Sequence, residues 1–114
     1  MVRPARLRRG LEFDTAYSQG TVLSGPLFVL RYRPNDCSES RWGFAIGRKL
    51  EKHAVARNRL RRKLREAARA IEVPVGFDFI LTARRGALSA RQLELQRALA
   101  ARLQEAGLGE SGSE

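Results

Sequence analysis

Arginines at helical spacing are the residues of this sequence best suited to bind a ligand. Four of them recur every four residues within residues 54–71, so at about 100° per residue they share one arc of a helix. A guanidinium is a planar fork of N–H donors that can bind two phosphate oxygens at once. The side chains in or beside this arc are Arg57, Asn58, Arg61, Arg62, Arg65 and Arg69. The segment therefore predicts a phosphate-binding helix face.

The remaining side chains of this helix divide into a packing stripe and a flank. Arg59, Lys63 and Glu66 occupy the flank, where Lys63 and Glu66 can pair at a spacing of three residues. The stripe is apolar, and we expect it to pack on a sheet. Its members are Leu60, Leu64, Ala67, Ala68 and Ile71.

An ordinary solvated helix face is the alternative interpretation of the arginine arc. Such a face is stabilised by its own ion pairs, but the four arginines spaced every four residues, from Arg57 to Arg69, have no acid four residues away from any of them. Like charges at that spacing destabilise a helix by about 0.2–0.5 kcal/mol per pair, and the arc holds three such pairs. We therefore expect the arc to meet a polyanion, since neutralised phosphates release counterions.

The charge of the whole chain supports a nucleic-acid partner. The 114 residues contain 22 Lys and Arg against 12 Asp and Glu, which gives a net charge of +10. Residues 48–69 hold ten of the basic side chains, opposed only by Glu51 and Glu66. A positive field concentrated in one segment is typical of a binding face for nucleic acid.

No arrangement of side chains predicts catalysis by the protein itself. The carboxylates are scattered, whereas a metal-dependent nuclease needs them clustered, so we expect no catalytic residue and no metal site. His53 is expected to be a loop residue or a phosphate donor, and Cys37 a loop bystander. No segment approaches the roughly 18 apolar residues of a membrane span, and no secretory signal is apparent. A cytoplasmic protein is the expectation.

Six elements are expected to position the basic helix. They are a short helix over residues 10–19, strands over 27–33 and 41–48 that form a hairpin, the basic helix over 54–71, a strand over 77–83, and a last helix. The last helix is expected to open with a capping box at Ser89 and to end near Ala106. The order α-β-β-α-β-α predicts a small α+β sandwich, with helices packed on a central sheet.

The chain is short enough for a single domain with one core. Residues 1–9 are expected to form a mobile basic arm, residues 10–108 the RNA-binding domain, and residues 109–114 a disordered tail. Phe13 and Tyr17, four residues apart, share one face of the first helix.

The motif Arg57-Asn58-Arg59-Leu60-Arg61-Arg62-x-x-Arg65, preceded by Gly43-x-x-Ile46-x-Arg48-Lys49, resembles the signature of the bacterial ribonuclease P protein subunit. The resemblance covers nearly the whole chain. Three further segments fall in the order of that family: Phe13-x-x-x-Tyr17, Phe28-Val29-Leu30 and Phe79-Ile80-Leu81-Thr82-Ala83-Arg84.

The resemblance implies a subunit that assists a catalytic RNA in removing the 5′ leader of precursor tRNA. It implies a fold like domain 2 of ribosomal protein S5, with a left-handed β-α-β crossover, and catalytic Mg²⁺ bound mainly by the RNA. The expected partners are the ribonuclease P RNA and the leader, with no obligate protein partner. The residues expected to contact the RNA subunit, with Arg69 added from the arc, are Arg48, Lys49, Arg57, Asn58, Arg59, Arg61, Arg62, Arg65 and Arg69.

A cleft for the single-stranded leader is also implied by the resemblance. Phe13 and Tyr17 match aromatic positions of that cleft, and aromatic faces stack on unpaired bases. Core packing is the alternative for Phe13. Arg31 stands where many members carry another aromatic side chain, so this wall would bind the leader through charge.

Two other classes of protein remain open from the sequence. A ribosomal or other structural RNA-binding protein could have a similar architecture. A helix-turn-helix DNA regulator is disfavoured, because the basic helix is expected to lie between strands rather than beside a partner helix.

Overall fold

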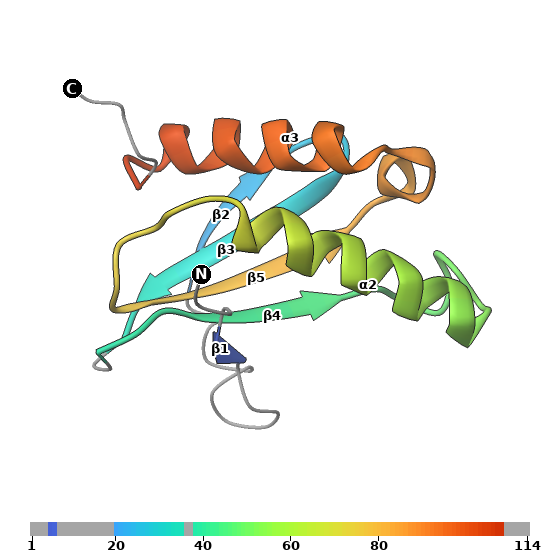
Figure 1. Cartoon of the computed structure of the whole chain (residues 1–114), viewed down its shortest axis with the longest axis horizontal. Coiled ribbons are helices and arrows are strands. Elements are labelled where there is room, and N and C mark those ends of the chain that lie inside the picture. Colours follow the sequence, from blue (N-terminus) through green and yellow to red (C-terminus); the bar gives the residue numbers. More distant parts are fainter. Residues whose placement is uncertain (1–4, 7–19, 36–37, 109–114) are drawn as a thin grey trace.

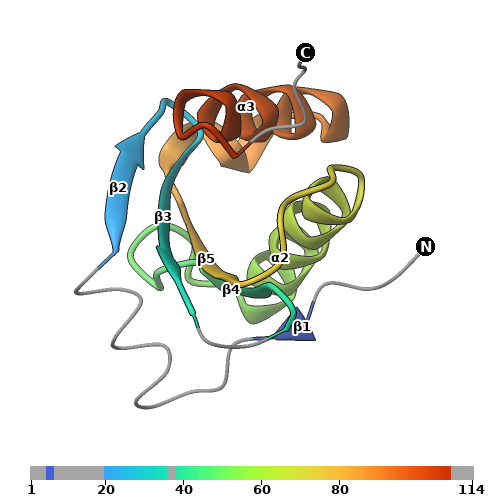
Figure 2. The same cartoon turned by 90° about the vertical axis from the view of Figure 1, so that its left-hand side faces the viewer.

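The computed structural model describes residues 5–6, 20–35 and 38–108. It contains a five-stranded sheet in the order β1-β4-β5-β3-β2, with both long helices on one side of it (Figures 1 and 2). The elements are β1 (Ala5–Arg6), β2 (Thr21–Ser24), β3 (Phe28–Pro34), β4 (Arg41–Ala45), α2 (Ala54–Arg69), β5 (Phe77–Ala83), the 3₁₀ helix η1 (Arg85–Ser89) and α3 (Gln92–Glu105). The predicted class, an α+β sandwich with helices on a central sheet, is confirmed.

The predicted hairpin between residues 27–33 and 41–48 is wrong. β5 lies between the two strands, antiparallel to β3 and parallel to β4. Phe79, Ile80 and Leu81 of β5 are fully buried, as expected for a central strand. Parallel strands need a crossover, and α2 supplies the crossover from β4 to β5.

The β4-α2-β5 crossover is left-handed, as Figures 1 and 2 show. Nearly all such crossovers in proteins are right-handed. In both views α2 covers the same face of the sheet as α3, and the sheet curves around the two helices. The crossover therefore places the basic helix along the β4 side of the molecule.

The core lies between this face of the sheet and the two helices. Alternate strand residues point into it, and Trp42 stacks on Phe79 with ring centroids 4.5 Å apart. The predicted packing stripe of α2 is confirmed for its four helical members, while Ile71 follows the helix and is partly buried. The principal core residues are Phe28, Leu30, Trp42, Leu60, Leu64, Ala67, Ala68, Phe79, Leu81, Leu95, Leu99 and Leu103.

The start of the last helix differs from the prediction. Ser89 ends η1 and does not cap α3. The N-cap is Arg91, whose backbone N–H donates to Glu94 Oε1 at 2.7 Å. The glutamate three residues after Arg91 offers this acceptor, which satisfies an amide that would otherwise have no partner at the helix end.

The remaining differences lie at strand ends and at the termini. β4 ends at Ala45 rather than at residue 48, because the chain turns at Gly47, whose carbonyl accepts the amides of Leu50 and Glu51. β2 was not predicted, and Ala5–Arg6 of the predicted basic arm pairs parallel with β4. The predicted helix over residues 10–19 and the predicted tail over 109–114 lie outside the described residues.

Candidate nucleic-acid interface

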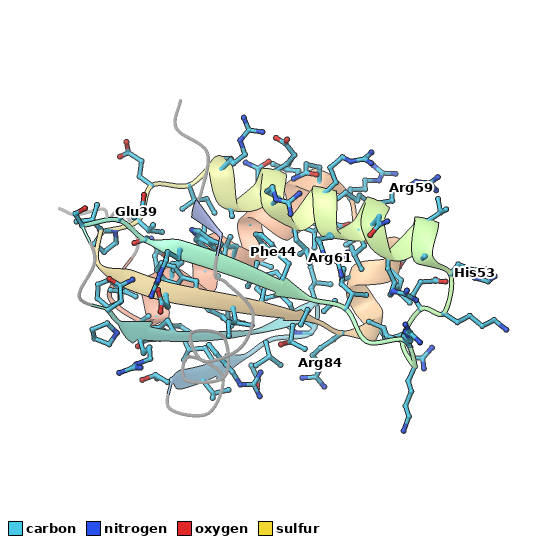
Figure 3. All side chains as sticks on the ribbon, turned by 90° about the horizontal axis from the view of Figure 1, so that it is seen from below. Glu39, Phe44, His53, Arg59, Arg61 and Arg84 are labelled. Atoms are coloured by element: carbon cyan, nitrogen blue, oxygen red, sulfur yellow. The ribbon has the colours of Figure 1, made fainter. Side chains whose placement is uncertain are left out.

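The polar surface of α2 has a solvent-exposed outer part and a row of less exposed arginines, here called the lower row. Asn58, Arg59 and Arg62 are exposed. The lower row is half-buried, so the stems of its arginines pack against the protein while their polar heads reach the surface. Its members are Arg57, Arg61, Arg65 and Arg69. Figure 3 shows Arg61 on the side of α2 that faces Phe44 of β4, and Arg59 on the opposite side.

Arg57 is attached to the loop that precedes its own helix. Its Nη1 donates to the backbone carbonyls of Glu51 and Lys52, each at 3.0 Å. A guanidinium has five N–H donors, so three of them are not used in these two bonds. Arg57 can therefore shape the loop and still present a positive charge to a ligand.

Asn58 and Phe44 orient two other arginines of the lower row. Arg61 Nη1 donates to Asn58 Oδ1 at 2.8 Å, which explains why a residue of poor helix propensity stands at this position. The guanidinium carbon of Arg65 lies 5.5 Å from the centroid of the Phe44 ring, within the range of a cation–π contact. The Arg61 guanidinium is thus oriented by an amide oxygen, and the Arg65 guanidinium lies over an aromatic ring.

The predicted pair between Lys63 and Glu66 is wrong. Lys63 Nζ donates to the carbonyl of Ala90 at 2.9 Å, because the start of α3 lies beside it. Glu66 Oε2 instead accepts from Arg69 Nη1 at 2.8 Å. Arg69 therefore has an acidic partner three residues away, and the last arginine of the arc is partly neutralised.

The loop before α2 carries further basic residues, and its only acid, Glu51, is bound to His53. Arg48, Lys49 and Lys52 are exposed. Glu51 Oε2 accepts the backbone N–H of His53 at 3.0 Å and lies 3.0 Å from His53 Nδ1. These contacts, the backbone hydrogen bond first, lower the pKa of the Glu51 carboxyl. His53 is a loop residue at the N-cap position of α2, in agreement with the sequence analysis.

The sheet face opposite the helices carries a second group of arginines. Phe28 and Leu30 point into the core, so Arg31 and Arg33 lie on the opposite face of β3. Arg31 Nη1 lies 3.4 Å from Thr82 Oγ1 of β5, a weak hydrogen bond.

An ion pair on this face was missed by the sequence analysis. Asp78 is 4% exposed and binds Arg41 through two bonds of 2.9 Å, while Asn35 Nδ2 donates to it at 2.6 Å. Arg41 and Asp78 meet because β4 and β5 pair in parallel register. The one signal for such a pair in the sequence is Asp78 itself, an acidic residue within the otherwise apolar segment 77–81.

Two negative findings apply to the part of the chain that the structure describes. No group of three or more His, Cys, Asp or Glu side chains could hold a metal ion there. Within the same residues, no helix is long and apolar enough to cross a membrane.

Together, these features define a small basic α+β protein with an arginine-bearing helix suited to a polyanion. α2 lies between β4 and β5 in the chain, which is not the arrangement of a helix-turn-helix. The family model described as Ribonuclease P matches residues 1–107, and the chain belongs to this family. It is therefore a ribonuclease P protein component, of the class of RNA-binding proteins that act in tRNA processing.

Individual relatives agree with the family assignment. The chain is 36% identical over 111 residues to the ribonuclease P protein component of Symbiobacterium thermophilum, which covers 95% of this chain and 96% of that protein. It superposes on the Staphylococcus aureus RNase P protein with a TM-score of 0.79 at 26% identity, covering 95% of this chain and all of that one. The RNase P protein of Thermotoga maritima gives a TM-score of 0.78 at 28% identity, covering 88% and 96%.

Proposed function

We propose that this chain binds the catalytic RNA of ribonuclease P through the arginine arc of α2, which extends from Arg57 to Arg69. The observation that carries this proposal is the way in which Arg57 and Arg61 are held. Their hydrogen bonds go to backbone carbonyls and to an amide oxygen, which orient a guanidinium without neutralising it. Oriented positive charges bind phosphate with little further loss of side-chain entropy.

We further propose that the sheet face opposite the helices binds the 5′ leader of precursor tRNA. Arg31 and Arg33 lie on this face and would bind the leader through its phosphates. Phe13 and Tyr17, assigned to the leader by the family resemblance, lie outside the described residues. Their expected contribution is stacking on unpaired bases.

The chemistry is proposed to reside in the RNA, together with the catalytic Mg²⁺. The protein would then act by positioning the precursor against the RNA, a role that needs oriented charges and no acid or base of its own. We place the complex in the cytoplasm and invoke no obligate protein partner. Arg48, Lys49, Asn58, Arg59, Arg62, Arg65 and Arg69 are included in the proposed RNA contact.

Two variants test whether the chain has these two surfaces. Arg61→Ala is expected to weaken binding to the ribonuclease P RNA and to reduce the slope of log K against log salt by about 0.7–0.9, the effect of one lost phosphate contact. Tyr17→Ala is expected to leave that binding unchanged. It should reduce the preference for precursor over mature tRNA by about 1–3 kcal/mol, the contribution of one stacked base.

Filter binding or fluorescence titration at several salt concentrations measures both effects. Arg97→Ala, an exposed arginine of α3, is the control for loss of one charge. Equal effects of Arg61→Ala and Tyr17→Ala on binding to the RNA subunit would show that the two-surface model is wrong.

A further inference from the structure

Two loops with basic side chains begin side by side at one end of the sheet. β4 and β5 run parallel, and Ala45 pairs with Thr82 near their carboxyl ends. The chain leaves β4 into residues 46–53 and leaves β5 into residues 84–86. Figure 3 shows Arg84 at the end of the sheet from which the loop to α2 leaves. The exposed basic residues of the two loops are Arg48, Lys49, Lys52, Arg84 and Arg85, here called the strand-end cluster.

The turn that carries Arg84 and Arg85 is closely held to the rest of the fold. The Arg84 N–H donates to the carbonyl of Leu27 at 2.9 Å, and the Ala87 N–H donates to the carbonyl of Arg84 at 2.9 Å. A Cβ on Gly86 would lie 2.8 Å from the Pro26 carbonyl oxygen, so only glycine fits this approach. The backbone that presents the two arginines is therefore ordered before any ligand binds, which lowers the cost of binding.

The positive charge of the strand-end cluster is almost unopposed. Glu51 is the only acid within residues 46–53 and 84–86, and its carboxylate is turned to the amide and ring of His53. Arg84 Nη1 lies 3.3 Å from the carbonyl of Gly25, which is an uncharged partner. A surface that serves only solubility mixes both signs of charge, whereas these two loops carry five exposed basic side chains against the single acid Glu51.

We propose that the strand-end cluster is a second phosphate-binding site, which takes the sugar-phosphate backbone of the same RNA that α2 binds. Arg84 and Arg85 are its new members, contributed by a turn outside the basic helix and its loop. The cluster extends the contact surface from the beginning of α2 to the ends of β4 and β5. It would therefore bind a segment of the RNA backbone that the arginine arc does not contact. This inference rests on the proposed function.

The double variant Arg84→Gln/Arg85→Gln tests the second site. Its affinity for the ribonuclease P RNA is expected to fall by about tenfold or more, and its salt slope by about 1–2, because two phosphate contacts are lost. The control Arg91→Gln/Arg97→Gln removes the same two charges from exposed positions on or next to α3, and a change below about twofold is expected for it. Arg85→Gln alone, at an exposed side chain, repeats the test with the Arg84–Gly25 contact intact.

Hydroxyl-radical protection of the RNA backbone separates the two sites. With Arg84→Gln/Arg85→Gln, the RNA is expected to lose protection over one segment of its backbone. The segment that loses protection with Arg61→Ala should stay protected. The second site is contradicted if the double variant binds and protects as its control does while the wild-type protein binds the RNA normally. If the wild-type protein itself fails to bind this RNA, the proposed function and the second site are both wrong.

Discussion

Replacing Arg57 by alanine is expected to weaken binding to the ribonuclease P RNA by about tenfold or more, since one hydrogen bond to a charged group contributes about 1.5–3 kcal/mol. The loss has two sources. One is the positive charge itself, and the other is the pair of bonds from Nη1 to the carbonyls of Glu51 and Lys52. Without those bonds the loop that carries Arg48 and Lys49 is no longer held, and its ordering becomes a further cost of binding.

Arg62→Ala is the matched control, because Arg62 is an exposed arginine of the same helix face. It removes an equal charge and leaves the loop intact, so the loss of affinity for the RNA is expected to be about fivefold smaller than with Arg57→Ala. Hydrogen exchange of the backbone amides in residues 48–53 should accelerate in free Arg57→Ala and stay unchanged in free Arg62→Ala. Equal affinities together with equal exchange rates would show that Arg57 does not position the loop.

Replacing Asp78 by alanine is expected to lower the free energy of unfolding by about 3–5 kcal/mol, the usual cost of removing one partner of a buried ion pair. Asp78 is 4% exposed, and the side chain of its partner Arg41 is 17% exposed. The variant leaves the Arg41 guanidinium poorly solvated and without its bidentate bonds to Asp78, and it removes the shorter of two hydrogen bonds donated by Asn35 Nδ2.

Urea denaturation followed by circular dichroism measures this change. Glu105→Ala is the control, because it removes a carboxylate whose side chain is 54% exposed, in a pair with Arg102 at 3.1 Å. Exposed pairs contribute only about 0–1 kcal/mol. A loss for Asp78→Ala no greater than that for Glu105→Ala would contradict the structural importance of the buried pair.

The sequence predicted α2 and its division into faces because the signal is local. Helical geometry alone places Leu60 and Leu64 in one stripe and the arginines in another arc, whatever the rest of the chain does. The strands over residues 27–33 and 77–83 were also predicted, because their apolar residues form compact runs between turn residues.

The strand order and the contacts of the site depend on long-range pairing, which no local pattern records. The position of β5 between β3 and β4 separates two strands that are neighbours in the sequence, and the left-handed crossover is contrary to the general rule. The hydrogen bonds of Arg57 to the loop before α2 and of Lys63 to Ala90 depend on where that loop and the start of α3 lie. The helical pattern of residues 54–71 does not indicate either position. The buried stripe of α2 could therefore be predicted from the sequence, whereas the contacts that orient its arginines could not.

A paired cleavage assay tests most directly whether this protein assists the ribonuclease P RNA, as we propose. Precursor tRNA is incubated at low Mg²⁺ with the RNA subunit alone, with the protein alone, and with both. We expect little cleavage by the RNA alone, none by the protein alone, and efficient release of the 5′ leader by the two together. Cleavage by the RNA that is not stimulated by the protein, or cleavage by the protein alone, would contradict the account.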